Sequence, residues 1–335
     1  MRILVIGAGA VGGYFGGRLG AAGRNVTFLV REGRAAQLRR TGLRIFDAAY
    51  GDMTLAPRQL KLLTAKQLRD QPEEFDLVLV STKAYSLDAA MEDFAPAMGL
   101  ETVVLPLLNG MRHLDALQAR FGSHAVLGGT TYLVADLDAE GAVRSMTALH
   151  DLNFGERDKQ VTARIRAIEA ALTGAGFDAR LRPDVLATMW QKWTMLASAG
   201  AINCLMRAPI GAAVSAPGGR ETARQVMTEC ETIAAANGYP AEDLEQRVAT
   251  EQRLLNPAST LTTSMYRDMQ RGLPVEADHI LGDMVERGHR HGVEAPLLRT
   301  AYAQLSAYST ELAKELAKAQ EAAGPRRETP IIGRS

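Results

Sequence analysis

A glycine motif near the start of the chain has the residue types and spacing that bind a dinucleotide. The sequence GAGAVG at 7–12 follows an apolar, β-forming run at 2–6 and precedes a helical pattern at 13–22. In this strand–turn–helix context, the first glycine makes a tight turn, the second lets the backbone approach a pyrophosphate, and the third lets helix and strand pack closely. The start of the helix offers N–H groups to the phosphates. We therefore predict a coenzyme site that includes Gly7, Gly9, Ala10, Val11 and Gly12.

Lys192 is the single charge in an otherwise uncharged stretch from Val185 to Met206, where it lies between Trp190 and Trp193. The stretch is long enough to span a bilayer, but a lysine near its middle makes that placement costly. We expect instead a buried helix that Pro209 stops. A charged amine inside such a helix must be paired or face a cleft. The alternative is a lysine that snorkels from a crowded surface, and position alone leaves both open.

The end of the second predicted strand, at 25–30, carries the residues that would choose between coenzymes. Glu32 would favour NAD by binding the ribose 2′-hydroxyl, whereas Arg31 with Arg34 would favour NADP by binding its 2′-phosphate. Strand alternation puts Arg31 at the edge of the crevice, so we predict NADP(H). The alternative is that all three are solvated loop charges.

Two more polar residues follow predicted parallel strands. Lys83 comes after the apolar run at 75–80, and Asn109 comes after the run at 102–107. Ligands of open α/β sheets bind outside the carboxyl ends of the strands, so both residues are candidates for the site. Each could equally be a loop residue that satisfies local backbone.

A segment in the second half of the chain groups further polar residues. Ser264 and Asp268 are four residues apart and would share one face of a helix. Gly272 and Pro274 would end that helix and start another, with Glu276 in its first turn. From the residues alone, we favour a structural role in which Glu276 complements the helix dipole.

Composition excludes several kinds of partner. Lys and Arg number 38, as do Asp and Glu, so no bulk charge attracts the chain to nucleic acid or to an anionic membrane.

The two cysteines, Cys204 and Cys230, have no metal-binding spacing and indicate buried thiols in a reducing compartment. No histidine pair has the spacing of a metal site, so we predict no metal. The N-terminus runs straight into a strand, so we expect a cytoplasmic protein.

The pattern changes at Pro183, after which the chain is almost wholly helical. The predicted fold class is an α/β Rossmann-type N-terminal domain at 1–182, followed by an all-α C-terminal domain at 183–322. Residues 323–335 are rich in Pro, Gly and charge and are expected to be disordered. Among the expected elements are strands at 125–127, 130–135, 143–148 and 152–154, a hairpin at 43–56, and helices at 158–172, 259–271 and 275–291.

The motifs in combination resemble those of ketopantoate reductase (2-dehydropantoate 2-reductase) and its wider family. The matching segments cover most of the chain in the right order: GAGAVG at 7–12, the arginine at 31, TKA at 82–84, LNG at 108–110, GTT at 129–131, MWQKW at 189–193, and SMYRD…G…E from 264 to 276. Many nucleotide-binding families share the first motif, whereas the later combination is rather specific. The resemblance implies a Rossmann domain followed by a helical domain, with a small carbonyl substrate held between them.

The resemblance also implies roles for particular residues. In that family, a ketone accepts hydride from NADPH while the helix lysine, here Lys192, protonates its oxygen. The family's glutamate, here Glu276, orients the substrate hydroxyl, and Ser264 helps to bind the substrate carboxylate. Asn109 and Lys83 would lie by the nicotinamide and the substrate, with Arg31 on the 2′-phosphate.

The chain departs from the family pattern close to the lysine. Ketopantoate reductases tend to place asparagines four and eight residues after it, where this chain has Leu196 and Gly200. Asn203 shares the helix face but lies about 16 Å further along, and Leu261 replaces another polar contact. The implied pocket is therefore less polar, and discrimination that depends on such hydrogen bonds changes with it.

We predict an NADPH-dependent reductase of a 2-oxo acid, with ketopantoate as the default substrate by resemblance. One alternative is a divergent member that acts on a less polar carbonyl or hydroxy acid. Another is a nucleotide-binding sensor without turnover, although a sensor has no need of Lys192 and Glu276. The residues do not determine the oligomeric state, for which a homodimer is the candidate.

Overall fold

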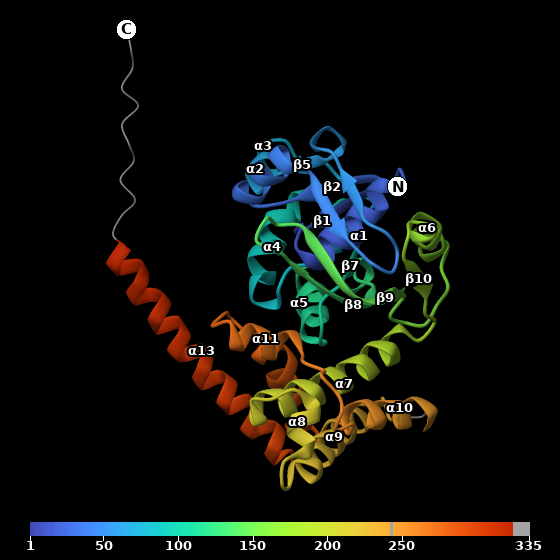
Figure 1. Cartoon of the computed structure of the whole chain (residues 1–335). Coiled ribbons are helices and arrows are strands. Elements are labelled where there is room, and N and C mark those ends of the chain that lie inside the picture. Colours follow the sequence, from blue (N-terminus) through green and yellow to red (C-terminus); the bar gives the residue numbers. More distant parts are fainter. Residues whose placement is uncertain (242–243, 324–335) are drawn as a thin grey trace. The chain divides into compact units, whose positions relative to one another are not determined.

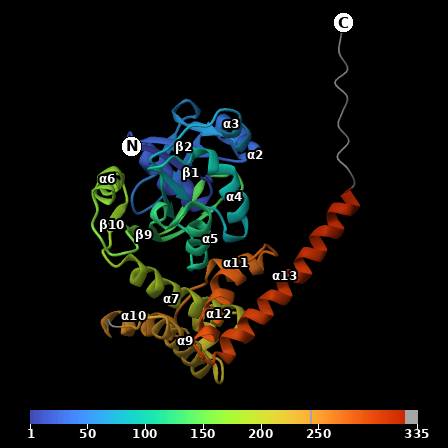
Figure 2. The same cartoon turned by 180° about the vertical axis from the view of Figure 1, so that it is seen from behind.

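The computed structural model describes residues 1–241 and 244–323, and the chain divides into two compact units between Trp193 and Thr194. The first unit is α/β and the second is helical (Figure 1; Figure 2 from behind), which confirms the predicted fold class. The division lies within helix α7 (Val185–Met206), later in the chain than the change at Pro183. Apart from Ala323, the tail expected to be disordered lies outside the described residues.

A five-stranded parallel sheet with the order β5-β2-β1-β6-β7 positions the predicted coenzyme residues. Its strands are β1 (Arg2–Ile6), β2 (Asn25–Leu29), β5 (Lys61–Leu63), β6 (Leu77–Val80) and β7 (Val103–Pro106). The carboxyl ends of parallel strands share one edge. The glycine motif and the segments that carry Arg31, Lys83 and Asn109 therefore all leave the sheet at that edge.

A second sheet of the first unit has the order β10-β9-β3-β4, with β8 paired to β9. Its strands are β3 (Leu43–Phe46), β4 (Met53–Leu55), β8 (Gly128–Leu137), β9 (Val143–Gly155) and β10 (Asp178–Leu181). The β3–β4 hairpin is confirmed. The two strands expected at 143–148 and 152–154 are one strand, because β8 pairs along β9 across a register shift at Leu133/Ala135. The strand expected at 125–127 is wrong: Ser123–Ala125 is a 3₁₀ turn and Val126 makes one bridge to Val104.

The helices of the first unit are α1 (Ala10–Ala21), α2 (Glu32–Thr41), α3 (Ala65–Asp70), α4 (Leu87–Phe94), α5 (Arg112–Phe121) and α6 (Ala163–Leu172), and α7 begins there. Helix α6 starts later than the expected 158. Lys159 has a left-handed φ of 66°, which a helix cannot include, and the Thr162 side chain caps the helix by accepting from the Ile165 N–H.

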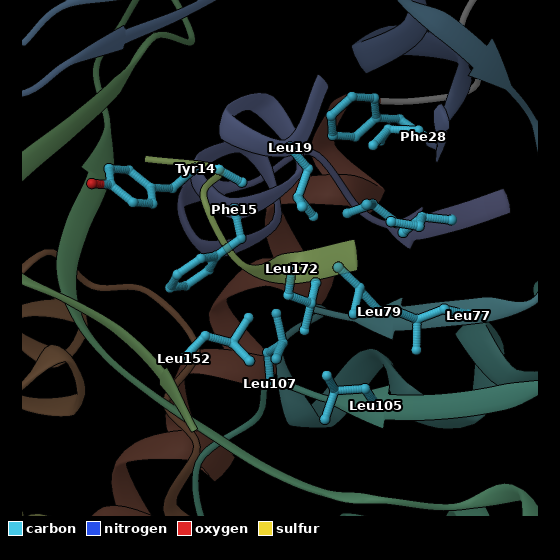
Figure 3. Packing of buried hydrophobic residues seen from close by; sticks show 14 of the residues in the cluster. Tyr14, Phe15, Leu19, Phe28, Leu77, Leu79, Leu105, Leu107, Leu152 and Leu172 are labelled. Atoms are coloured by element: carbon cyan, nitrogen blue, oxygen red, sulfur yellow. The ribbon is translucent and has the colours of Figure 1, made fainter. Parts of the chain in front are cut away.

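Helix α1 packs against strands of both sheets, and its glycines allow the close approach. A Cβ at Gly16 would lie 2.6 Å from the Phe28 ring of the first sheet. A Cβ at Gly17 would lie 2.9 Å from Ile45 of the second sheet. On the same helix, Tyr14, Phe15 and Leu19 fill the core with leucines of both sheets (Figure 3). Glycine weakens an isolated helix, so packing and not intrinsic propensity holds α1.

The second unit continues α7 and adds α8 (Ile210–Ser215), α9 (Gly219–Ala236), α10 (Leu244–Leu254), α11 (Ser264–Gln270), the π-helix η5 (Asp278–Gly282), α12 (Asp283–Arg290) and α13 (Pro296–Ala323). Helix α11 begins at Ser264 and not at the expected 259, because the Thr263 side chain caps it by accepting from the Tyr266 N–H. No helix in the described ranges is both long enough and apolar enough to cross a membrane.

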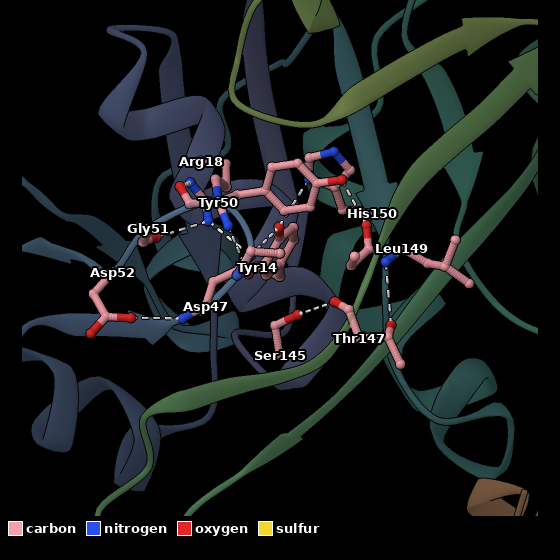
Figure 4. Close-up of polar contacts among 12 residues, drawn as sticks. Tyr14, Arg18, Asp47, Tyr50, Gly51, Asp52, Ser145, Thr147, Leu149 and His150 are labelled. Atoms are coloured by element: carbon pink, nitrogen blue, oxygen red, sulfur yellow. Dashed lines mark hydrogen bonds and ion pairs between the residues drawn. The ribbon is translucent and has the colours of Figure 1, made fainter.

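A buried polar cluster ties α1 to the β3–β4 loop and to β9 (Figure 4). Arg18 and Tyr14 of α1 both bond to the Asp47 carboxylate, at 2.9 and 2.7 Å. The Tyr14 oxygen lies 3.2 Å from His150 Nδ1, and the Tyr50 ring stacks on the imidazole with centroids 3.4 Å apart. Because the single Tyr14 hydroxyl hydrogen goes to Asp47, His150 must carry its hydrogen on Nδ1 to bond to Tyr14.

The pKa of His150 predicts a pH dependence of stability. Burial lowers this pKa below 6.5, outweighing the attraction of Asp178 and Asp47 for the protonated ring. As the pH falls below 6.5, His150 is protonated in the unfolded chain while it is still neutral in the folded chain. The contribution of the neutral His150 to the free energy of unfolding is therefore complete above pH 6.5 and is lost as the pH falls toward the lowered pKa of the folded state. The melting temperature of His150→Asn, which keeps a donor but cannot titrate, should fall less than that of the wild type between about pH 7.5 and pH 5.5. The control His291→Asn removes an exposed histidine and should follow the wild type; an equal fall in all three proteins would contradict the prediction.

Candidate functional site

The glycine turn after β1 is built as a dinucleotide site requires. Gly7 has a φ of +89°, which favours glycine. A Cβ at Gly12 would lie 2.1 Å from Ser81 Oγ and 2.2 Å from the Gly7 carbonyl oxygen. Ser81, at the end of β6, donates its hydroxyl to the Ile6 carbonyl at 2.7 Å. The third glycine of the motif therefore makes room for a serine that binds the end of β1.

The same turn fits the phosphates of a dinucleotide. Gly9 is the N-cap of α1 with no side-chain cap, and no heavy atom lies within 4 Å of the position that a Cβ would take. Backbone N–H groups at such a helix start bind anions. Nearby, Thr82 Oγ1 is buried without a hydrogen-bond partner in the described chain, and its methyl group lies 3.9 Å from a Cβ position at Gly7. A buried hydroxyl without a partner is costly, and a bound ligand could satisfy it. The sequence indicated Thr82 only through the TKA motif.

Arg31 is exposed at the start of α2, where its Nη2 lies 3.5 Å from Ser86 Oγ. Lys83 precedes the 3₁₀ turn Ala84–Ser86, so the segment that carries it lies next to Arg31. This basic corner is accessible to a phosphate. Glu32, the residue that would favour NAD, is also exposed, in the first turn of α2.

Arg34 does not join Arg31 at the position where a 2′-phosphate would bind. It donates from Nε and Nη2 to the Ala8 carbonyl, at 3.0 and 2.8 Å, and from Nη1 to Gln37 Oε1 and the Gly141 carbonyl, at 2.6 and 2.9 Å. Four of the five N–H donors of a guanidinium are thus committed to the protein. The expectation that Arg34 reinforces Arg31 on a 2′-phosphate is therefore not supported.

Lys192 is buried, with 7% of its surface exposed, which excludes the snorkelling alternative. Its ammonium donates to Asn109 Oδ1 at 2.8 Å and to the Thr131 carbonyl at 2.5 Å. Two residues that were predicted separately, the lysine of α7 and the asparagine after β7, are thus in direct contact. The contact also brings Lys192 to the GTT segment of β8.

The start of α7 reaches β8 because Gly128 leaves space for it. A Cβ at Gly128 would lie 2.4 Å from Val185 Cγ1 and 3.4 Å from Met189 Sδ. Two turns after Val185, this packing delivers Lys192 to the carbonyl of Thr131, further along the same strand. Small residues on β8 are therefore part of what positions the lysine.

Tyr132 is a neighbour of Lys192 that the sequence did not single out. The lysine Nζ lies 5.6 Å from the centre of the half-buried Tyr132 ring, within the range of a cation–π contact. Its position directly after the GTT motif was the available signal. An aromatic ring therefore borders the ammonium.

Within the second unit, the positions where the family tends to have asparagines are committed to packing. A Cβ at Gly200 would lie 2.7 Å from Met265 Cε, so a larger residue would displace that methionine. Leu196 is half-buried. Asn203 is fully buried, donates to the carbonyl oxygens of Ala208 and Leu261 at 2.9 and 3.4 Å, and accepts from the Thr263 N–H at 2.9 Å. Asn203 thus holds the backbone before α11 and does not replace the missing asparagines.

Ser264 and Glu276, the predicted substrate residues of the second unit, are both half-buried. Ser264 is the first residue of α11, which also contains Asp268. Glu276 directly precedes Ala277, the first helical residue, and its carbonyl accepts from the Ile280 N–H at 3.0 Å, so it lies at the N-cap of the helix that continues through η5 and α12, one residue before the predicted first turn. The π-helix that follows is rare and is often found at functional sites. Across residues 1–241 and 244–323, no group of three or more His, Cys, Asp or Glu side chains could hold a metal ion.

Two family models match the chain in sequence order. "Ketopantoate reductase PanE/ApbA" matches residues 3–159, and "Ketopantoate reductase PanE/ApbA C terminal" matches residues 184–309. Together they cover most of both compact units.

Individual relatives agree in length and fold. An uncharacterized oxidoreductase of Bacillus subtilis (strain 168), YkpB, is 36% identical over 312 residues, which are 93% of this chain and all of the relative. The solved structure of 2-dehydropantoate 2-reductase from Geobacter metallireducens GS-15 is 27% identical with a TM-score of 0.81, covering 91% of this chain and 99% of that one. D-mandelate dehydrogenase, solved with NADH and anilino(oxo)acetate, has a TM-score of 0.82 over 93% of this chain and 99% of that one. At 20% identity it shows a shared fold only.

Two alanine substitutions should separate the folding and binding roles of the glycine turn. Gly9→Ala adds a methyl group where space is open, so it should lower stability by less than about 1 kcal/mol while weakening coenzyme binding. Gly12→Ala forces atoms onto Ser81 and the Gly7 carbonyl and should cost roughly 1–3 kcal/mol of stability as well as binding. Thermal unfolding and coenzyme titration test both effects. Equal stability losses in the two variants would show that the space beside Gly9 is not open.

Proposed function

The chain belongs to the ketopantoate reductase family and is an oxidoreductase acting on a CH–OH group, and from this premise we propose that it reduces a 2-oxo acid with NADPH. Ketopantoate (2-dehydropantoate) is the default substrate and pantoate the product, which would give the chain a role in pantothenate biosynthesis. The observation that carries the proposal is Lys192: a buried ammonium in an apolar helix, bonded to Asn109 and to β8.

Lys192 would act as the proton donor. A bound nicotinamide coenzyme supplies the hydride to the carbonyl carbon of the substrate. Among its partners, the Asn109 amide oxygen and the Thr131 carbonyl are uncharged, so they orient the ammonium without taking its proton. The ammonium would stabilise the negative charge that develops on the carbonyl oxygen and then transfer a proton from Nζ to that oxygen.

Further residues would bind and orient the two ligands. We assign Ser264 to the substrate carboxylate and Glu276 to the substrate hydroxyl, in agreement with the family motif and with their half-buried positions. The glycine turn would bind the pyrophosphate, and Asn109 and Lys83 would lie by the nicotinamide. Arg31 would bind the 2′-phosphate at the exposed start of α2. A cytoplasmic location and a homodimer remain predictions.

Arg31→Ala should remove most of a preference for NADPH over NADH. A charge-assisted contact to phosphate is worth about ten- to a hundredfold in affinity, and alanine cannot make it. The dissociation constants of both coenzymes, measured for wild type and variant, test this. If the wild type binds NADH as tightly as NADPH, then Glu32 is the residue that selects the coenzyme and the choice of Arg31 is wrong.

Lys192→Ala should lower kcat by about 10²–10⁴ while leaving NADPH binding nearly unchanged, because the lysine acts on the substrate oxygen. Steady-state kinetics with the best substrate and coenzyme titration provide the two readouts. Near-native turnover in the variant would return Lys192 to a structural role.

A second candidate substrate class, a carbonyl compound with an apolar flank, is supported by the surroundings of α7. The Tyr132 ring borders the ammonium, Leu196 replaces an asparagine, and the methyl group of Met265 packs against Gly200. The Leu196 side chain and the Met265 methyl group cannot make the amide hydrogen bonds that a dedicated ketopantoate site uses. If this second candidate is the true substrate class, ketopantoate would be turned over poorly and a less polar carbonyl compound would be turned over faster.

NADPH oxidation against a panel of 2-oxo acids that includes ketopantoate tests the substrate. The less polar members should have the higher kcat/KM, and Leu196→Asn should shift the ratio toward ketopantoate because it restores an amide near Lys192. Ketopantoate as the best substrate of the wild type, with kcat/KM above about 10⁴ M⁻¹s⁻¹, would contradict the apolar-flank hypothesis. Tight NADPH binding without turnover of any member would instead support a sensor.

A further inference from the structure

Arg34 joins three segments of the first unit that are distant in sequence. It lies in the first turns of α2, two of its nitrogens bond to the Ala8 carbonyl of the glycine turn, and a third bonds to Gly141 in the β8–β9 turn. Gln37, one turn further along α2, donates to the neighbouring Glu140 carbonyl at 2.8 Å. The fit is close, since a Cβ at Gly141 would lie 2.5 Å from Arg34 Nη1.

The contact with Ala8 has a consequence for the next residue. The peptide bond is planar and trans, so the Ala8 C=O and the Gly9 N–H point in opposite directions. Two N–H donors on the Ala8 oxygen therefore fix the Gly9 N–H on the side away from Arg34. Gly9 is the N-cap residue beside which space is open. Its N–H is thus one of the groups that could meet a pyrophosphate, and Arg34 sets its direction.

We propose that Arg34 is a positioning residue for the coenzyme pyrophosphate: it orients the Gly9 N–H through the Ala8 carbonyl and does not read the 2′-phosphate. The inference rests on the proposed use of a nicotinamide dinucleotide, and it divides the two arginines of this corner by role. Arg31 discriminates between NADPH and NADH, whereas Arg34 contributes to the binding of both. A pyrophosphate is common to the two coenzymes, so the effect of Arg34 must be common to them as well.

The test is a matrix of dissociation constants for NADPH and NADH, measured with the full chain. Arg34→Met removes the donors to Ala8 but keeps an unbranched side chain that can pack. Arg34→Lys keeps one charged donor that can reach the Ala8 carbonyl. Arg40→Met removes a positive charge from an exposed position in the last turn of the same helix and is the matched charge control. Arg31→Ala is included for contrast, because it should lower the affinity for NADPH and leave the affinity for NADH nearly unchanged.

Arg34→Met should raise the dissociation constants of NADPH and NADH by the same factor, about tenfold, so that their ratio stays that of the wild type. The KM for either coenzyme should rise with it, whereas kcat at saturating coenzyme should stay near the wild-type value. Arg34→Lys should retain part of the affinity that Arg34→Met loses, again equally for both coenzymes. Arg40→Met should have the same dissociation constants as the wild type. If Arg34→Met does not fold, Arg34→Lys alone tests the proposal, because it should lose affinity for NADPH and NADH by the same factor.

Three results would overturn the assignment. Selective loss of NADPH in the Arg34 variants would make Arg34 a second reader of the 2′-phosphate. Unchanged constants for both coenzymes would show that the bonds to Ala8 are only structural. An equal loss of coenzyme affinity in Arg40→Met would show that the change in net charge, and not the contact with Ala8, weakens binding. A wild-type chain that binds neither coenzyme would contradict the proposed function itself, and these outcomes are therefore distinguishable.

Discussion

The close approach of two sheets to helix α1 is the constraint on which the first unit depends. Glycines on both sides of the helix bring it within contact of Phe28 on β2 and Ile45 on β3, at a cost of about 1 kcal/mol of helix propensity for each glycine. Burial of Tyr14, Phe15 and Leu19 between the sheets offsets that cost. Because the helix is held from both sides, its first turn is fixed at the edge of the parallel sheet where phosphates would bind.

Strand β8 relates the two halves of the candidate site within the first unit. Near its start, Gly128 admits the beginning of α7 and the Thr131 carbonyl accepts from Lys192. Beyond its end, the turn to β9 is held by Arg34, which also holds the Ala8 carbonyl in the glycine turn. The lysine and the glycine turn are thus supported by opposite ends of one hairpin.

Much of this arrangement could be predicted from local patterns, and the rest depends on tertiary contacts. The GAGAVG motif and the isolated charge of Lys192 indicated the fold class and a buried amine, because glycine spacing and hydrophobicity are local signals. That Asn109 accepts from Lys192, or that Arg34 bonds to Ala8, follows from pairings across the fold that spacing does not encode. The late starts of α6 and α11 trace to single threonine caps within sequences that otherwise suit a helix.

Helix α7 crosses the boundary between the compact units, with Lys192 just before it and Leu196 and Gly200 just after it. A recombination event between family members at that boundary would cut the helix and separate the proposed proton donor from the positions proposed to set substrate choice. A crossover at Pro183 would exchange all three residues as one block, together with the Val185 side chain that must match Gly128 on β8. Chimeras with exchanged helical domains should therefore be joined before α7, and their success would depend on a small residue on the recipient's β8.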